Sequence, residues 1–415
     1  MKKLITVLSV LIILMVMLTF YGRWLSQTNV SKDNNLIISR KPDSTVFRKG
    51  KLEAMPTYNE NSGMPFERDL RCYDPSGLDL RNNLIELLHS DFDSKTNWPK
   101  SLPVGFNPDS IMEIGRNPGL NVRKLHEVGI TGKGVGIAII DQDLLVDHIE
   151  YKDQLRMYEE IHTPKNATAS MHGSAVASIA VGKTVGTAPG ADLYYISSDD
   201  GTIFNRIKYI LFKNKDINPK WRVKSIYRVL EINRTLPIDK KIRVISISFG
   251  SDRRNFLKAI EAAGKEGVFV ISSSLNKTHN LQFNGLGRDC LTDPDNFLSY
   301  FPGSFWSNYF YKNPDKFNID STLMIPMDSR CTASQSGINS YVFYSNGGWS
   351  WSIPYIAGLY ALACQVKPTV TPHEFWNKAL ETGNIIEIEK KGIKYRFGKI
   401  VNPVKLIESL KESTI

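Results

Sequence analysis

The stretch that decides the fold is GKGVGIAIID, residues 132–141, in which glycines precede an apolar run that ends in Asp141. A dinucleotide-binding loop needs its glycines after a strand and before a helix, so that the helix N-terminus meets the phosphate. Here the glycines come before the strand, which excludes that interpretation. The pattern predicts a buried strand with an acid at its carboxyl end, where catalytic groups gather in open α/β sheets. Taken alone, Asp141 could equally cap a turn.

Similar apolar runs alternate with helix-like segments along the rest of the chain. The runs predicted as buried strands are Val135–Ile140, Leu193–Ile196, Val244–Phe249, Val268–Ser272 and Leu323–Met327. The predicted helices are His172–Gly182, Ser251–Gly267, Ser350–Cys364 and Pro403–Lys411, with a further helix start at the capping box Thr371–Glu374. This alternation predicts an α/β fold of three layers, with a mostly parallel central sheet flanked by helices.

Two of the predicted helices begin with a side chain that can do chemistry. His172 opens a run of small residues, which would let its helix sit tightly on a sheet, and Gly173 predicts open space beside the ring. Ser350 follows two glycines and a tryptophan and starts an apolar helix, whose N-terminus brings positive partial charge and free N–H groups. Each has a plainer interpretation, because a lone histidine is more often structural and a serine here is commonly an N-cap.

An amide ends another segment. Residues 267–276 read GVFVISSSLN, a buried strand that runs out into small polar residues and ends with Asn276. At a strand tip, the side-chain NH2 of Asn276 could donate to a developing oxyanion together with the backbone N–H of Ser350. Asparagine at such a place is also a common turn residue.

Together these segments resemble the subtilisin-like serine proteases (subtilases, the peptidase S8 family). That family places an aspartate after a G-x-G-V-x-V-A-V-hydrophobic stretch, a histidine in H-G-T-x-V-A-G and a serine in G-T-S-M-A-x-P. Residues 132–141, 172–177 and 348–354 stand in those places, and residues 267–276 match the run before the family's asparagine. The spacing of the last motif selects Ser350, and not Ser352, as the nucleophile.

The resemblance implies a serine endopeptidase with a subtilisin-like fold that acts on a polypeptide and needs no cofactor. It implies a catalytic triad of Asp141, His172 and Ser350, with Asn276 in the oxyanion hole. It also implies that an extended substrate pairs with an exposed strand edge near Ser248-Phe249-Gly250. Many relatives bind structural calcium, but no Asp-rich loop of this chain compels a metal site. We expect a monomer.

Departures from the family pattern support one alternative function. Gln142-Asp143 replaces the usual S/T-G after the aspartate, and Trp349 and Trp351 flank the serine, where they would crowd the cleft. The alternative function is therefore a catalytically impaired domain that serves as a peptide-binding or scaffolding module. An α/β-hydrolase is excluded, because its G-x-S-x-G elbow needs a second glycine, and its acid and histidine follow the serine.

The amino terminus predicts export. Lys2 and Lys3 precede an uncharged, mostly apolar run from Leu4 to Gly22, which is the layout of an export signal and nearly long enough to span a bilayer. Since bulky residues occupy the place of a small-x-small cleavage site, residues 1–25 are predicted to be an uncleaved signal anchor in preference to a cleaved signal peptide. Either way, the rest of the chain is expected outside the cytoplasmic membrane.

Between this segment and the peptidase domain, expected at residues 117–415, lie residues 26–116, predicted as a linker and an N-terminal extension. The first part is polar, and the second holds one helical stretch, Leu80–Leu88, and several prolines. The extension could be a pro-segment, a stalk or a packing arm, and the sequence does not distinguish these.

Composition adds two limits. The 415 residues carry a formal net charge of +10, but no nucleic-acid motif accompanies the scattered basic residues, so nucleic acid is not an expected partner. The four cysteines lack C-x-x-C spacing, which argues against structural zinc or a redox motif. Cys364 is expected to be buried, whereas Cys290 and Cys331 either form a disulfide after export or stay free.

Overall fold

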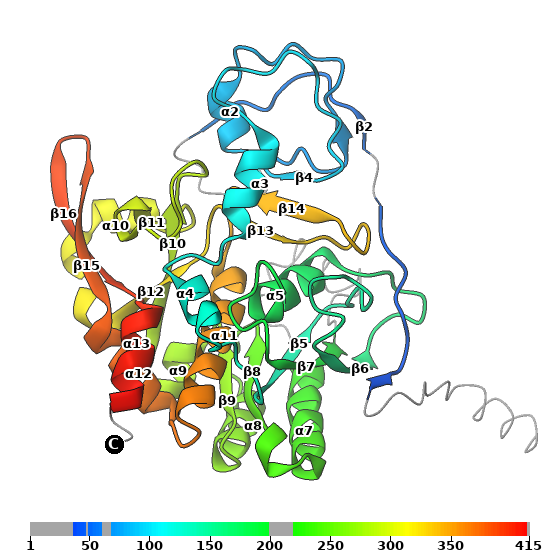
Figure 1. Ribbon diagram of the computed structural model, residues 1–415, viewed down its shortest axis with the longest axis vertical. Helices are drawn as coiled ribbons and strands as arrows, with labels where there is room; N and C mark the ends of the chain where they lie inside the picture. Colours follow the sequence, from blue (N-terminus) through cyan, green and yellow to red (C-terminus); the bar gives the residue numbers. More distant parts are fainter. Residues whose placement is uncertain (1–35, 47–48, 60–67, 199–218, 413–415) are drawn as a thin grey trace, which may run out of the picture.

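Figure 1 shows the computed structural model of the chain, which describes residues 36–46, 49–59, 68–198 and 219–412. The predicted signal segment at residues 1–25 lies outside the described residues. Among the helices that are described, none has the length and apolar character needed to cross a membrane.

The centre of the described structure is a sheet of six parallel strands in the order β1-β6-β7-β5-β8-β9. The strands are β1 (Ile37–Ile38), β5 (Gly136–Asp141), β6 (Leu155–His162), β7 (Asp192–Ser198), β8 (Ile242–Ile247) and β9 (Phe269–Ser272). Apolar runs predict β5, β7, β8 and β9. They miss β6, because its sequence, LRMYEEIH, mixes buried residues with charged ones on a partly exposed strand.

Helices cover both faces of this sheet, which confirms the predicted three-layer α/β fold (Figure 1). The helices on one face are α5 (Met171–Val181) and α11 (Trp349–Val366), and those on the other are α7 (Lys220–Thr235) and α8 (Arg254–Lys265). Successive side chains of a strand point to opposite faces. Ile137 and Ile139 of β5 therefore join the core under α5 and α11, whereas Ala138 and Ile140 join the core under α7 and α8. Burial on both faces explains the uninterrupted apolar run.

A second, mixed sheet and several helices complete the carboxyl-terminal half. Its strands, in the order β11-β10-β12-β16-β15, are β10 (Gln282–Arg288), β11 (Tyr300–Pro302), β12 (Thr322–Pro326), β15 (Asn384–Lys390) and β16 (Ile393–Ile400). Four helices described in this half are α9 (Leu275–His279), α10 (Ser307–Lys312), α12 (Pro372–Thr382) and α13 (Pro403–Glu412). Helix α4 (Val122–Glu127) lies earlier in the chain and packs on α13. As predicted, Thr371 caps α12, its side chain accepting from the backbone N–H of Glu374.

The extension before residue 117 packs directly on the rest of the described chain. Its elements are β2 (Gly50–Lys51), β3 (Tyr73–Asp74), α2 (Leu84–Leu88), β4 (Phe92–Asp93) and α3 (Pro108–Arg116). Strand β4 pairs with β14 (Tyr341–Tyr344), which in turn pairs with β13 (Arg330–Ala333). Leu87 and Phe92 of the extension share one hydrophobic cluster with Phe343. The extension is thus a layer on β13 and β14 (Figure 1).

Residues 36–46 differ from the linker that the sequence predicts. Ile37 and Ile38 form the edge strand β1 beside Met157 and Tyr158 of β6. Further along, the Thr45 hydroxyl donates to the carbonyl of Ala169 at 2.9 Å. The two-residue strand is too short to show a sequence period, which is why the polar surroundings suggested a linker.

All four cysteines are free thiols, so the disulfide considered for Cys290 and Cys331 is not formed. Cys331 is fully buried, and its sulfur lies 3.3 Å from that of Met112. Burial raises the pKa of Cys331 to about 12 and that of Cys290 to about 11. Cys364 is buried, as expected. These thiols serve as small apolar side chains.

Candidate active site

Asp141 and His172 are in direct contact at the carboxyl edge of the sheet. Asp141 is the last residue of β5, is 7 % exposed, and accepts a hydrogen bond from the backbone N–H of Gln142 at 2.8 Å. Its Oδ1 also lies 2.7 Å from Nδ1 of His172. A carboxylate at Nδ1 holds the proton on that nitrogen and leaves Nε2 as the basic one.

His172 lies in the first turn of α5, which is fastened to the loop after Asp141. Ser170 caps the helix, since its hydroxyl oxygen accepts from the backbone N–H of His172 at 3.1 Å while its hydroxyl donates to the Gln142 side chain. A Cβ on Gly173 would come within 2.6 Å of the Gln142 carbonyl oxygen. The space expected beside the ring is therefore filled by this loop, and the glycine is needed for close approach.

Asp143 supports the same loop from behind. It is 4 % exposed and accepts hydrogen bonds from the Ser197 hydroxyl at 2.8 Å and the Tyr158 hydroxyl at 3.1 Å. Burial raises the pKa of this carboxyl. Arg40 of the amino-terminal segment lies 3.5 Å from it and donates to Glu160 at 2.7 Å. The residue that departs from the family pattern thus ties the loop to β6, β7 and residues 36–46.

Ser350 lies in the first turn of α11 and is half-buried. Its backbone carbonyl accepts a hydrogen bond from the Ser248 hydroxyl at 3.1 Å. Ser352, the other serine of the motif, is fully buried, and its hydroxyl donates to the carbonyl of Pro326 at 3.3 Å. Of these two serines, only Ser350 is accessible.

The two tryptophans beside the serine have different surroundings. Trp351 is 2 % exposed, and its ring centroid lies 5.5 Å from the His172 ring and 5.2 Å from the Tyr344 ring. Trp349 is half-buried against Phe283, at 5.7 Å. Trp351 therefore does not crowd the cleft, contrary to the expectation for it, but forms a wall behind the histidine. Through it, the start of α11 lies against His172.

The turn before Ser350 is held by an aspartate that sequence reasoning missed. Asp328 is 6 % exposed, and its two carboxylate oxygens accept from the backbone N–H groups of Gly347 at 2.7 Å and Ser304 at 2.8 Å. Burial raises its pKa to about 6. No local motif marks Asp328, because its partners lie 19 and 24 residues away in the chain.

Asn276 is not at a strand tip as expected. It lies in the short helix α9, after β9 and two serines, and it is exposed. Within the described residues, its side-chain amide has no hydrogen-bond partner among the protein groups. The structure places no described contact between this amide and Ser350. The helix arises because Leu275 inserts into the core and starts a turn there.

Residues Ser248, Phe249 and Gly250 follow β8, which ends at Ile247 between β5 and β9. They are half-buried and are not the exposed strand edge that was expected. The carbonyl of Phe249 accepts from the backbone N–H of Ser273 at 3.1 Å. A Cβ on Gly250 would lie 2.5 Å from the Ser274 hydroxyl. The segment is nevertheless beside the nucleophile, through the contact of Ser248 with Ser350.

Among the described residues, no three His, Cys, Asp or Glu side chains are grouped so that they could hold a metal ion. An acid, an imidazole and a hydroxyl are side chains that suit nucleophilic acyl transfer.

Comparisons with known proteins match part of the chain to one family. Residues 132–306 match the model of Peptidase_S8, the subtilase family, a match that includes Asp141, His172 and Asn276 but ends before Ser350. No curated protein sequence matches the chain. Among solved structures, the prenylagaramide maturation protease PagA is 15 % identical, with a TM-score of 0.44, and the match covers 70 % of this chain and 98 % of that one. The PatG macrocyclase domain is also 15 % identical, with a TM-score of 0.46 and coverage of 71 % and 95 %. Residues 132–306 are therefore similar to the subtilases, a family of serine proteases.

Proposed function

We propose that the protein is a serine endopeptidase that hydrolyses peptide bonds through an acyl-enzyme. The observation that carries the proposal is the 2.7 Å contact between His172 Nδ1 and Asp141 Oδ1, at the sheet edge where α11 begins. Asp141 would keep the imidazole in the tautomer whose Nε2 is a base, and it would stabilise the imidazolium that forms. The accessible Ser350 at the start of α11 would be the nucleophile.

In acylation, Ser350 Oγ attacks the carbonyl carbon while His172 Nε2 takes the hydroxyl proton, which gives a tetrahedral oxyanion. The C–N bond then breaks, and the imidazolium gives its proton to the leaving amine. In deacylation, His172 takes a proton from water, the hydroxide attacks the ester, and the C–O bond to Ser350 breaks. The proton returns to Ser350 Oγ, so the enzyme is regenerated without a cofactor.

The oxyanion would be bound by the backbone N–H of Ser350 and by the side chain of Asn276. The first-turn N–H groups of a helix have no partner within the helix. The uncommitted, exposed amide of Asn276 supports its role as the second donor. Removing one such donor typically lowers turnover by about 10²-fold to 10³-fold.

The substrate would be an extended polypeptide lying along Ser248, Phe249 and Gly250. What supports this is the hydrogen bond from the Ser248 hydroxyl to the Ser350 carbonyl, which puts the segment beside the attacking group. We propose a monomer held at the membrane by residues 1–25, with the peptidase domain outside the cytoplasm. Mass spectrometry of the amino terminus of the exported protein tests this, since cleavage after the signal segment would give a secreted form.

A fluorophosphonate probe tests the nucleophile in the full-length protein. We expect labelling of the wild type, none of Ser350→Ala, and unchanged labelling of the matched control Ser352→Ala, because the Ser352 hydroxyl lies inside the core. Peptide cleavage should follow labelling, and circular dichroism should show both variants folded. Labelling that survives in Ser350→Ala would remove Ser350 from the mechanism. If the folded wild type does not label, the domain is the alternative, a peptide-binding or scaffolding module.

A further inference from the structure

A series of side-chain contacts connects the extension to the candidate histidine. The series starts at Arg71, in the loop before β3, and continues through Tyr344, at the end of β14, and Trp351, in the first turn of α11. It ends at the ring of His172. Trp351 and His172 lie within the motifs that resemble the family, but Arg71 and Tyr344 do not, and Arg71 is 273 residues from Tyr344 in the sequence.

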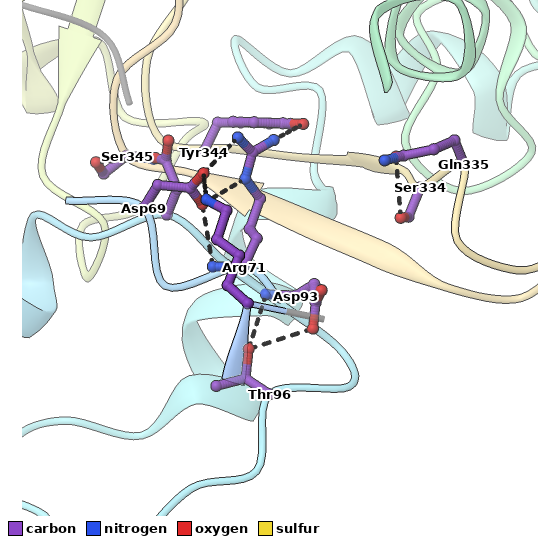
Figure 2. A network of polar contacts seen from close by, with 10 residues as sticks. Asp69, Arg71, Asp93, Thr96, Ser334, Gln335, Tyr344 and Ser345 are labelled. Carbon is purple, nitrogen blue, oxygen red and sulfur yellow. Dashed lines mark hydrogen bonds and ion pairs between the residues drawn. The ribbon is translucent and has the colours of Figure 1, made fainter. Parts of the chain in front are cut away.

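Arg71 is held rigidly on the extension side, as Figure 2 shows. Its Nε donates to Asp69 Oδ1 at 2.7 Å, and its Nη2 donates to Asp69 Oδ2 at 3.0 Å. This two-point geometry fixes both the direction and the plane of a guanidinium. The arginine side chain is only 14 % exposed. The remaining terminal nitrogen, Nη1, donates to the Tyr344 hydroxyl at 2.7 Å.

Tyr344 transmits this restraint to the wall of the active site. It is fully buried, and its ring meets that of Trp351 edge-on, at 5.2 Å between centroids and 74° between planes. The indole Nε1 of Trp351 is buried without a hydrogen-bond partner in the described structure. Trp351 is therefore kept in place by packing, and the Tyr344 ring is part of that packing.

His172 is positioned by the contact of its Nδ1 with Asp141 and by this wall. A rotation of the imidazole about the Nδ1 contact would move Nε2 relative to Ser350. The Trp351 ring, 5.5 Å away and inclined at 53°, blocks one direction of that motion. A shift of about 1 Å in a reacting group can cost about 10²-fold in rate.

We propose that Arg71 is a positioning residue for His172, acting through the Tyr344 hydroxyl and the Trp351 indole, and that the extension is therefore part of the active enzyme. This rests on the proposed function of the His172 site. The shared hydrophobic cluster agrees with retention, because removing the extension would expose Phe343 and Cys331, which are fully buried. The extension is a packing arm, and not a pro-segment that leaves on maturation.

The chain contains a matched control. Asp69-Leu70-Arg71 is repeated ten residues later as Asp79-Leu80-Arg81, and Arg81 also bonds its own aspartate, with Nε to Asp79 Oδ1 at 2.9 Å. The Arg81 side chain, however, is 69 % exposed and its hydrogen bonds in the described structure stay within the extension. Arg81→Gln therefore removes the same local pair without touching Tyr344.

The experiment measures kcat, KM and the fluorophosphonate labelling rate of the full-length protein, with the unfolding temperature of each sample. For Arg71→Gln and Tyr344→Phe, we expect kcat and labelling to fall about tenfold, less than the ~10²-fold of a full 1 Å displacement, with KM within about twofold. The double variant should lose no more than either single one, because both changes break one contact. Arg81→Gln should match the wild type.

The outcomes separate the two proposals. If the wild type neither labels nor cleaves, the proposed function fails, and the role of Arg71 fails with it. If the wild type is active and folded Tyr344→Phe keeps full kcat, only the positioning role is overturned. An equal loss in Arg81→Gln, or additive losses in the double variant, would assign the effect to a general weakening of the extension. Either result would also overturn the positioning role of Arg71. Tyr344→Phe removes a single oxygen, so it keeps the test open if Arg71→Gln does not fold.

Discussion

Asp91 offers a test of how the extension is attached to the rest of the protein. It is 2 % exposed, and its Oδ1 accepts from the backbone N–H of Ser345 at 2.8 Å, while its Oδ2 is buried without a partner. Burial raises its pKa from 3.8 to about 7, although the charge of Arg71 opposes the rise. We predict that the free energy of unfolding of Asp91→Asn, compared with that of its parent, rises with pH.

The direction of this pH dependence follows from the number of protons that the folded and unfolded states bind. Since the folded state holds the Asp91 proton up to about pH 7, it binds more protons than the unfolded chain between about pH 4 and pH 7, and stability falls as the pH rises through that window. The shift from 3.8 to about 7 corresponds to about 4 kcal/mol, at about 1.4 kcal/mol per pKa unit. Asparagine keeps an oxygen for Ser345 and carries no titrating proton, so this dependence disappears.

Urea unfolding measures the effect in a Ser350→Ala background, which prevents self-cleavage. From pH 4.5 to pH 8, the free energy of unfolding of Asp91→Asn should rise by about 3 kcal/mol relative to its parent, the part of the full effect that falls in this range. Asp153→Asn, at an exposed position, is the control and should run parallel to the parent. A constant difference between Asp91→Asn and its parent at all pH values would refute the reasoning.

Three other substitutions test local packing. Gly173→Ala would put a Cβ 2.6 Å from the Gln142 carbonyl, so peptide cleavage should fall by up to about 10²-fold while the circular dichroism spectrum stays native. Gly358→Ala would meet Thr187 Cβ at 2.5 Å, and urea titration should show a loss of about 1–3 kcal/mol from overpacking. Thr371→Ala removes the cap of α12, and should cost about 1 kcal/mol, restored by Thr371→Ser, in the same titration.

The main sheet and its helices could be predicted because their signals are local. Ile137 to Ile140 are buried on both faces of β5, which makes an apolar run that needs no knowledge of its partners. The same holds for the small residues of α5, which is buried from Gly173 to Val181. Asp141 and His172 come at the ends of such elements, but their pairing was expected only from the resemblance to the subtilisin-like proteases.

The parts that the sequence did not predict depend on contacts between distant segments. Asn276 was expected at a strand tip, but burial of Leu275 starts a helix there. The two residues of β1 acquire their strand only by pairing with β6. Likewise, Arg71 and Asp328 carry no motif, because their partners, Tyr344 and Gly347, lie elsewhere in the chain. Long-range polar contacts of this kind leave no periodic trace.

These distant contacts converge on one segment, the turn that leads from β14 to Ser350. Buried carboxylates hold two of its backbone N–H groups, Asp91 that of Ser345 and Asp328 that of Gly347. Burial raises the pKa of both acids, to about 7 and about 6.

A protonated carboxyl still offers an oxygen that accepts a hydrogen bond. The turn should therefore stay in place while these acids titrate. Asp91→Asn keeps that oxygen for the backbone N–H of Ser345 and should leave the acid side of the kcat/KM profile where it is in the wild type. A shift of that side in Asp91→Asn would mean that the charge of the carboxylate, and not its oxygen, holds the serine in place.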